Sequence, residues 1–263
     1  MSQIWNLTSH QLGRRWRSLL IWSVVIGALG ALYVALFPAM STMLDEYMKN
    51  APESMRQYMG GVQGPITIEQ WMDMEFTGSI IPIALPFLVM LMGARAVAGS
   101  EERRTLDLLL SNPLQRRHIV AGAALTMAIA LTGVLVITWI LTYIAVLASG
   151  VGLSAGRLAE GLVVFWPYCL FFGSLALLLS AFMRRAALVT TITAVVLVAM
   201  YVIQGLSQVS KAIEPFRFVS LIYQLGHPIQ GDFPWTAVLV MLAAIAVFTA
   251  GAMALLARRD VYT

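Results

Sequence analysis

Long uncharged runs alternate along this chain with short charged segments. The run from Ser18 to Leu44 holds 27 residues without a charge, well beyond the roughly 7 to 15 of a signal-peptide core and above the ~20 that cross a bilayer. The pattern predicts one membrane domain over 1–263, all α-helical with six spans. Its segments are an interfacial helix (1–17), span 1 (18–37), an outer loop (38–75), span 2 (76–98), a charged inner loop (99–118), span 3 (119–149), span 4 (161–183), span 5 (186–206), an outer re-entrant or interfacial hairpin (207–232) and span 6 (233–257).

Prolines predict where two of these spans end or bend. The first spanning helix is expected to end near Phe37 and Pro38. In the second span Pro82 and Pro86 lie about one helical turn apart. Because a proline inside a helix removes a backbone hydrogen bond, this span is expected to be kinked.

Two short polar signals predict local structure between the spans. Only Arg184 and Arg185 separate the fourth and fifth apolar runs, so these two helices are expected to pack as an antiparallel hairpin. Thr67 and Gln70 have the spacing of a capping box, which predicts a helix beginning just before Trp71. Both signals are local and do not depend on the rest of the fold.

Composition supports a membrane protein and excludes a soluble one. Hydrophobic residues make up 59% of the chain and charged residues 11%, whereas a soluble domain typically carries about 25% charged residues. The mean hydropathy is +0.81 and the pI is near 9.5. In a membrane protein, basic residues mainly set orientation, so the net charge of +4 does not indicate a nucleic-acid partner.

The distribution of basic residues predicts the orientation of the six spans. With the N-terminus inside, twelve of the seventeen basic residues fall in cytoplasmic segments and five in outer segments. Nine of the thirteen acidic residues fall in outer segments. The positive-inside rule therefore predicts that both termini are cytoplasmic.

The sequence lacks the motifs of a nucleotide-binding or catalytic subunit. A phosphate-binding Walker A loop needs a Gly-Lys pair, but the two lysines follow Met48 and Ser210. Cys169 is a lone cysteine within an apolar run and is expected to be a core residue. Ser174 has no positioned base, and no histidine lies in a predicted span; the three histidines are His10, His118 and His227. We therefore expect no catalytic, metal or directly bound cofactor site.

The charged stretch from Gly99 to His118 is the best candidate for contact with a soluble partner. Ser100 can cap a helix there, and two glutamates in the first turn would oppose the positive end of its dipole. Pro113 limits this helix to about three turns. Charged positions then face one way, and a leucine stripe faces the other. A helix lying on the lipid headgroups would show the same pattern.

The order Glu-Glu-x-x-x-Thr-Leu-x-Leu-Leu-Leu-Ser-x-Pro-x-x-Arg in this stretch resembles the cytoplasmic loop of ABC-2 type transporter permeases. In that family the loop carries the coupling helix that contacts the ATPase subunit. The chain departs from the family pattern at Arg104, usually Gly, and at Ala123, usually Lys. The resemblance assigns ATPase coupling to Glu101, Glu102, Thr105, Leu106, Leu109, Leu110, Pro113 and Arg116.

The resemblance implies a non-catalytic permease subunit of an ABC exporter in a bacterial plasma membrane. Such a subunit pairs with a second permease, identical or different, and with two cytoplasmic ATPases that bind ATP and Mg. Because the spans are poor in ionisable groups, a drug, antibiotic or lipid-like cargo is expected. Sodium export, a stand-alone ion-coupled carrier or channel, and a membrane scaffold are the alternatives. The residues expected to line the pathway are Pro82, Pro86, Thr138, Tyr143, Tyr201 and Gln204.

Overall fold

A computed structural model describes residues 2–50, 66–78, 80–102, 116–207 and 213–258. Within these ranges the chain is helical, with no strand beyond one isolated bridge between His227 and Asp232. The elements in chain order are α1 (Ser2–Asn50), α3 (Ile68–Gly78), α4 (Ile81–Ala96), α5 (Ala98–Glu102), α7 (Arg116–Ser149), α8 (Ala155–Phe182), α9 (Ala186–Ser207), the 3-10 turn η1 (Glu214–Val219), α10 (Leu221–Gln224), the 3-10 turn η2 (Pro228–Gln230) and α11 (Trp235–Arg258).

Five of these helices, α1, α7, α8, α9 and α11, are long and apolar enough to cross a membrane. A sixth crossing results if α3 and α4 together form one span, bent by 47° at the break between them. At 16 residues, α4 alone is about 24 Å long and too short for a bilayer core of ~30 Å. The chain is therefore an all-α, multi-pass membrane protein with five long apolar helices, and with six crossings if α3 and α4 form one span.

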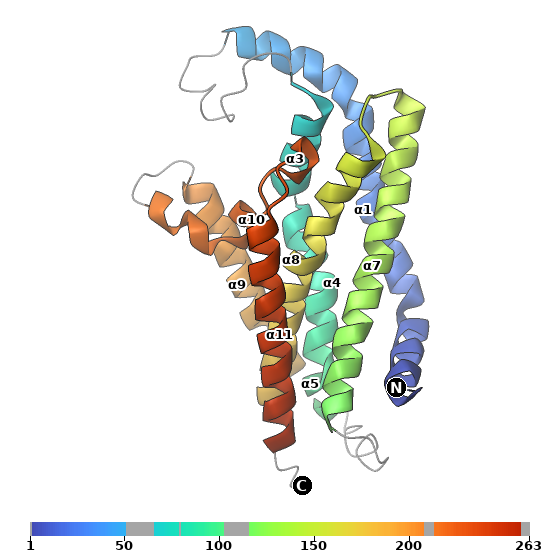
Figure 1. Cartoon of the computed structure of the whole chain (residues 1–263), viewed down its shortest axis with the longest axis vertical. Helices are drawn as coiled ribbons and strands as arrows, with labels where there is room; N and C mark the ends of the chain where they lie inside the picture. Colours follow the sequence, from blue (N-terminus) through green and yellow to red (C-terminus); the bar gives the residue numbers. More distant parts are fainter. Residues whose placement is uncertain (1, 51–65, 79, 103–115, 208–212, 259–263) are drawn as a thin grey trace.

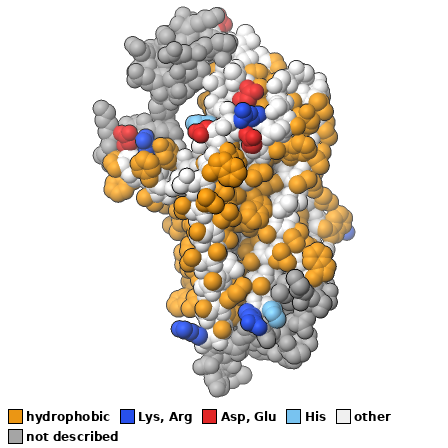
Figure 2. All heavy atoms as spheres, viewed as in Figure 1, with side chains coloured by type: hydrophobic (Ala, Val, Ile, Leu, Met, Phe, Trp, Pro, Cys, Tyr) orange, Lys and Arg blue, Asp and Glu red, His pale blue; other side chains and the backbone are white. Residues whose placement is uncertain are grey.

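The two ends of the bundle differ in composition. The first residue of α1 and the last residue of α11 lie at one end, which we call the terminal end, whereas α3 and η2 lie at the opposite, far end (Figure 1). On the face shown in Figure 2, hydrophobic side chains cover most of the height. The acidic side chains of described residues that this view shows lie near the far end. An apolar belt with charges at its two edges is what a lipid bilayer requires.

Helix α8 forms the centre of the bundle and packs against α4, α7, α9 and α11. Its buried aromatic side chains pack edge to face, with ring centroids 6.0 Å apart for Phe165 and Tyr168 and 5.4 Å apart for Tyr168 and Phe172. The backbones of α4 and α8 come closest where Gly93 faces Gly173, since a Cβ on Gly93 would overlap the Gly173 carbonyl oxygen. Glycine is needed here because the two helices touch through their backbones.

Helix α1 differs from its prediction. It continues without interruption through Pro38 to Asn50 and joins the predicted interfacial segment to the first span. The predicted end near Phe37 and Pro38 is therefore wrong. A proline removes only one hydrogen bond, and a membrane helix tolerates this when the flanking turns are intact. Beyond this point the helix leans across the far end of the bundle (Figure 1).

The break in the second crossing also lies elsewhere than predicted. The chain bends before Pro82, which occupies the second position of α4, where the N–H has no acceptor within the helix. Only Pro86 removes a helical hydrogen bond, and the carbonyl that it leaves free belongs to Pro82. The bend therefore comes from the helix break and not from two successive prolines.

Three local predictions are confirmed. Thr67 and Gln70 form the capping box at the start of α3, with the Thr67 N–H donating to Gln70 Oε1 at 3.2 Å and the Gln70 N–H donating to Thr67 Oγ1 at 3.3 Å. Helices α8 and α9 are joined by three residues and pack together. Cys169 is fully buried.

Candidate functional site

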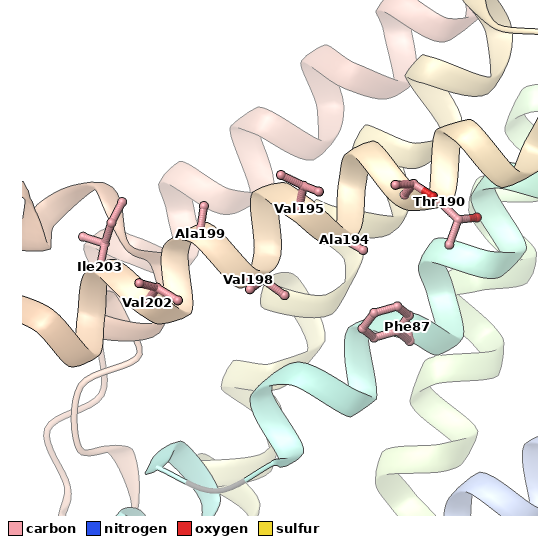
Figure 3. A pocket seen from close by; sticks show the side chains of 9 residues that line it. Phe87, Thr190, Ala194, Val195, Val198, Ala199, Val202 and Ile203 are labelled. Atoms are coloured by element: carbon pink, nitrogen blue, oxygen red, sulfur yellow. The ribbon is translucent and has the colours of Figure 1, made fainter.

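An apolar groove of about 670 Å³ runs along α9 where this helix faces α4 (Figure 3). Helix α4 contributes Phe87, and the remaining lining residues come from successive turns of α9. They are Thr190, Thr191, Ala194, Val195, Val198, Ala199, Val202 and Ile203. The Thr190 hydroxyl donates to the Ala186 carbonyl at 3.0 Å, so this hydroxyl is already paired within its own helix. The groove can therefore hold an apolar surface without exposing charge to it.

The groove is open because α9 is only partly covered by the rest of the chain. Only Ala186, Val189, Thr193 and Leu197 of this helix are buried. Its exposed face carries large apolar side chains along its whole length: Leu188, Ile192, Val195, Val198, Val202 and Leu206. A helix with this apolar face is suited to lipid, to cargo or to a second membrane subunit.

A second apolar groove, of about 480 Å³, lies between α7, α8 and α11. Trp139 and Trp166 line it, and both indole N–H groups bond within the chain, to the Ala155 carbonyl at 3.1 Å and to Thr132 Oγ1 at 3.0 Å. No groups of three or more His, Cys, Asp or Glu side chains occur in the described ranges in an arrangement that could hold a metal. Both grooves thus offer apolar contact and no metal ligands.

The six residues predicted for the pathway lie on three different helices. Pro82 and Pro86 are buried in α4, and neither lines the groove, although Pro86 directly precedes the lining residue Phe87. Thr138 and Tyr143 lie on α7, which packs mainly against α1 and α8. Tyr201 and Gln204 lie on α9 beside the groove residues. The structure therefore brings the α4 and α9 residues close to one groove and places the α7 pair in another part of the bundle.

The α7 pair has its own surroundings. Thr138 is fully buried, and its hydroxyl has no hydrogen-bond partner among the described residues. Tyr143 stacks on Trp139 with ring centroids 5.5 Å apart and an interplanar angle of 6°. On α9, Gln204 Oε1 is likewise buried without a partner in the described part of the chain. None of these contacts by itself identifies a ligand.

Most of the predicted coupling residues lie outside the described residues: Thr105, Leu106, Leu109, Leu110 and Pro113. Glu101 and Arg116 belong to the helices that flank this segment, α5 and α7. Ser100 is not the predicted N-cap, because it lies within α5 and its hydroxyl donates to the Ala96 carbonyl at 3.2 Å. The Glu102 side chain is described, and its Oε1 accepts a hydrogen bond from the Ala186 N–H at 3.0 Å.

Sequence reasoning missed a polar site at the far end. Asp73 of α3 is 1% exposed, and its carboxylate accepts three hydrogen bonds of 3.1 Å. The donors are the Ile229 N–H, the Gln230 N–H and Gln230 Nε2. The Ile229 side chain fills the space that a Cβ on Gly161 of α8 would occupy. The connection between α9 and α11 is therefore fastened to both α3 and α8. The only sequence signal was that Asp73 shares a helical face with Phe76.

Tyr168 was also missed, and it pairs the carbonyl that Pro86 leaves free. Its hydroxyl donates to the Pro82 carbonyl at 2.9 Å in a buried position between α8 and α4. Inside a membrane protein such a carbonyl has no water to replace this bond. This hydrogen bond allows a proline in the middle of a packed helix.

Tyr168→Phe should therefore destabilise the fold by about 1–3 kcal/mol, the usual cost of an unpaired buried polar group. The change keeps the ring and its aromatic contacts. The midpoint of unfolding in a mild detergent measures the effect. Tyr223→Phe, which keeps its ring edge to face with Phe218, is the matched control and should shift stability by less than about 0.5 kcal/mol. Equal midpoints for the two variants would contradict the role assigned to Tyr168.

Comparison with known protein families agrees with this architecture. The family model described as ABC-2 family transporter protein matches residues 5–261, nearly the whole chain. No curated protein shows a significant match to the chain. The match extends the resemblance seen in the charged stretch to all of the membrane helices. The chain therefore belongs to the ABC-2 family of transporter proteins, as a multi-pass permease of an ABC transporter.

Proposed function

We propose that this chain is the membrane subunit of an ATP-driven exporter of hydrophobic or amphiphilic molecules in a bacterial plasma membrane. It pairs with a second permease, and two cytoplasmic ATPase subunits bind ATP and Mg and drive it. The terminal end of the bundle is the cytoplasmic end. The chain itself has no catalytic role and forms the pathway.

The observation that carries this proposal is the open apolar groove between α4 and α9. Such an open groove becomes a closed passage only when another apolar surface covers it. A second permease closing over α9 would convert two open grooves into one enclosed passage at the subunit interface. The family membership supports this arrangement, because an ABC transporter needs membrane subunits around a common pathway.

The groove chemistry favours an amphiphile over an ion. A desolvated cation needs carboxylates or converging carbonyl oxygens at membrane depth. The groove lining contains no ionisable side chain and only two threonines. An apolar molecule needs only aliphatic and aromatic walls with a few hydroxyls. Sodium export is the second candidate within the same family.

Purification of the chain from its native membrane should bring down an ATPase with a Walker A motif. In the reconstituted complex, a fluorescent amphiphile such as Hoechst 33342 should stimulate ATP hydrolysis in a saturable manner, whereas a sodium titration at constant ionic strength should not. A saturable sodium response without any response to amphiphiles would overturn the choice of cargo. An absence of any ATPase from the purified protein would favour a stand-alone carrier or channel.

Cysteine cross-linking tests the position of α9 at the permease interface. Val198→Cys, on the exposed face of α9, should form a cross-linked pair of permeases in a Cys169→Ser background. Ile21→Cys is the matched control, since Ile21, at 64% exposed, is more accessible than Val198, at 44%, but lies on a different helix, α1. Cross-linking of the α1 variant alone would place the interface on the other side of the bundle.

A further inference from the structure

The junction of α4 and α5 is attached to the hairpin of α8 and α9 at the terminal end. Val97 lies between α4 and α5, and its N–H donates to Ser180 Oγ of α8 at 3.3 Å. A Cβ on Gly99 would lie 3.9 Å from the Ala186 Cβ. Glu102 Oε1 accepts the hydrogen bond from the Ala186 N–H. Two hydrogen bonds within six residues thus bind this junction to the hairpin, and both Gly99 and Glu102 lie against the first residue of α9.

The Glu102 carboxylate caps α9 from 84 residues away. The first N–H groups of a helix have no acceptor within the helix and need an outside partner. Arg185 precedes the helix and cannot serve, because its guanidinium has no acceptor. A carboxylate at this position gains a charge-assisted hydrogen bond and a favourable interaction with the helix dipole. Glu102 therefore supplies the cap that the local sequence of α9 lacks.

We propose that Glu102 is a positioning residue that passes a displacement of α5 to the N-terminus of α9. Glu102 is the last residue of α5 and is itself one of the residues predicted to couple to the ATPase. Helix α9 carries most of the groove lining. A displacement that begins at the ATPase contact therefore reaches the groove through this hydrogen bond. The inference rests on the proposed function, but it gives Glu102 a partner inside its own chain and not on the ATPase.

Two substitutions separate these roles. Glu102→Gln keeps an acceptor oxygen but removes the charge, whereas Glu102→Ala removes both. Ala186→Pro removes the donor without breaking the helix, because proline is favoured at the first helical position. The preceding Arg185 acts as the N-cap, its carbonyl accepting from the Val189 N–H at 3.2 Å, and an N-cap residue usually has the extended backbone that proline requires of its predecessor.

Hydrogen exchange of the purified full-length chain tests the bond itself. In Glu102→Ala the amides in the first turn of α9 should exchange about fivefold faster, as expected for the loss of one hydrogen bond. Glu102→Gln should remain within about twofold of wild type, because a neutral acceptor keeps most of the protection. Glu160→Ala, which removes an exposed carboxylate of α8 paired with Arg157, should leave this region unchanged. Unchanged exchange in Glu102→Ala would overturn the proposal.

The complex with its co-purifying ATPase tests transmission. Maleimide labelling of Val195→Cys in the groove, in a Cys169→Ser background, should change when ATP is added. Glu102→Ala and Ala186→Pro should each abolish the ATP-induced change in labelling, whereas Glu102→Gln should retain it. The double variant Glu102→Ala/Ala186→Pro should show the same labelling as either single variant. Two outcomes would overturn the proposal and place the carboxylate on the ATPase. In the first, Ala186→Pro keeps the ATP-induced change in labelling; in the second, Glu102→Gln loses it as fully as Glu102→Ala does. If no ATPase co-purifies, both the proposed function and the proposed transmission are wrong. The hydrogen-exchange measurement does not need the ATPase and still tests whether Glu102 caps α9.

Discussion

Asp73→Ala is expected to lower the free energy of unfolding by about 3–5 kcal/mol, the usual cost of removing one partner from a buried charged interaction. The change leaves the Ile229 N–H, the Gln230 N–H and the Gln230 side-chain amide without their acceptor. The Ile229 N–H is buried, so water does not readily replace it. The midpoint of unfolding in detergent measures the loss, and faster proteolysis between α9 and α11 should accompany it.

Two further variants show whether the effect comes from the carboxylate. Asp73→Asn keeps the shape and one acceptor oxygen but turns an NH₂ group toward a donor. Its free energy of unfolding should therefore lie between those of the wild type and Asp73→Ala. Glu69→Ala removes a half-buried carboxylate from the same helix and should cost less than about 0.5 kcal/mol. If Asp73→Ala were no less stable than Glu69→Ala, the far-end attachment would be unimportant to the fold.

Gly93→Ala is the second substitution with a large expected effect. Its Cβ would overlap the Gly173 carbonyl oxygen and would lie 3.1 Å from the Leu177 backbone nitrogen. Because both atoms are backbone of α8, no side-chain rotation can relieve the overlap, and α4 must move away from α8. Overpacking of a core usually costs about 1–3 kcal/mol, and we expect a value at the upper end.

Gly133→Ala is the matched control for this substitution, since a Cβ on Gly133 has nothing within 4 Å. It also lies within a long membrane helix, α7. Replacing glycine by alanine in a helix gains about 0.8–1.0 kcal/mol of propensity, so this variant should be neutral or stabilised. Displacement of α4 should also alter the groove at Phe87, so Gly93→Ala should lose amphiphile-stimulated ATP hydrolysis while Gly133→Ala keeps it. Equal midpoints and equal stimulation would contradict the close approach of α4 and α8.

The features that the sequence predicted well depend on residues close together in the chain. Thr67 and Gln70 are three residues apart, and the hairpin of α8 and α9 follows from a link of three residues. The apolar runs were identified because one turn after another carries no charge. The transporter family was recognised from the order of residues in the charged stretch, which is also a local property, and the family match confirms it.

The features that were missed depend on contacts between distant residues. Asp73 meets Ile229 across 156 positions, and Tyr168 meets Pro82 across 86. Nothing near Asp73 indicates that its acceptor capacity is filled by a turn at the other end of the chain. The same applies to Pro38, since whether a proline ends a helix depends on what supports the turns around it. Thr138 and Tyr143 were chosen for the pathway because polar residues stand out in an apolar run; their helix does not line the groove between α4 and α9, and their role stays a prediction.

The short link between α8 and α9 has a consequence for the insertion of the protein during its synthesis. Three residues extend over roughly 10–14 Å, too short to cross a bilayer core of ~30 Å. The second helix therefore cannot enter the membrane in the same direction as the first, and the two insert as one antiparallel pair. Arg184 and Arg185 in this link then set the direction of both helices with a single pair of charges. When α9 leaves the ribosome, Glu102 has already been made, so the acceptor for its first N–H is in the nascent chain before the helix forms.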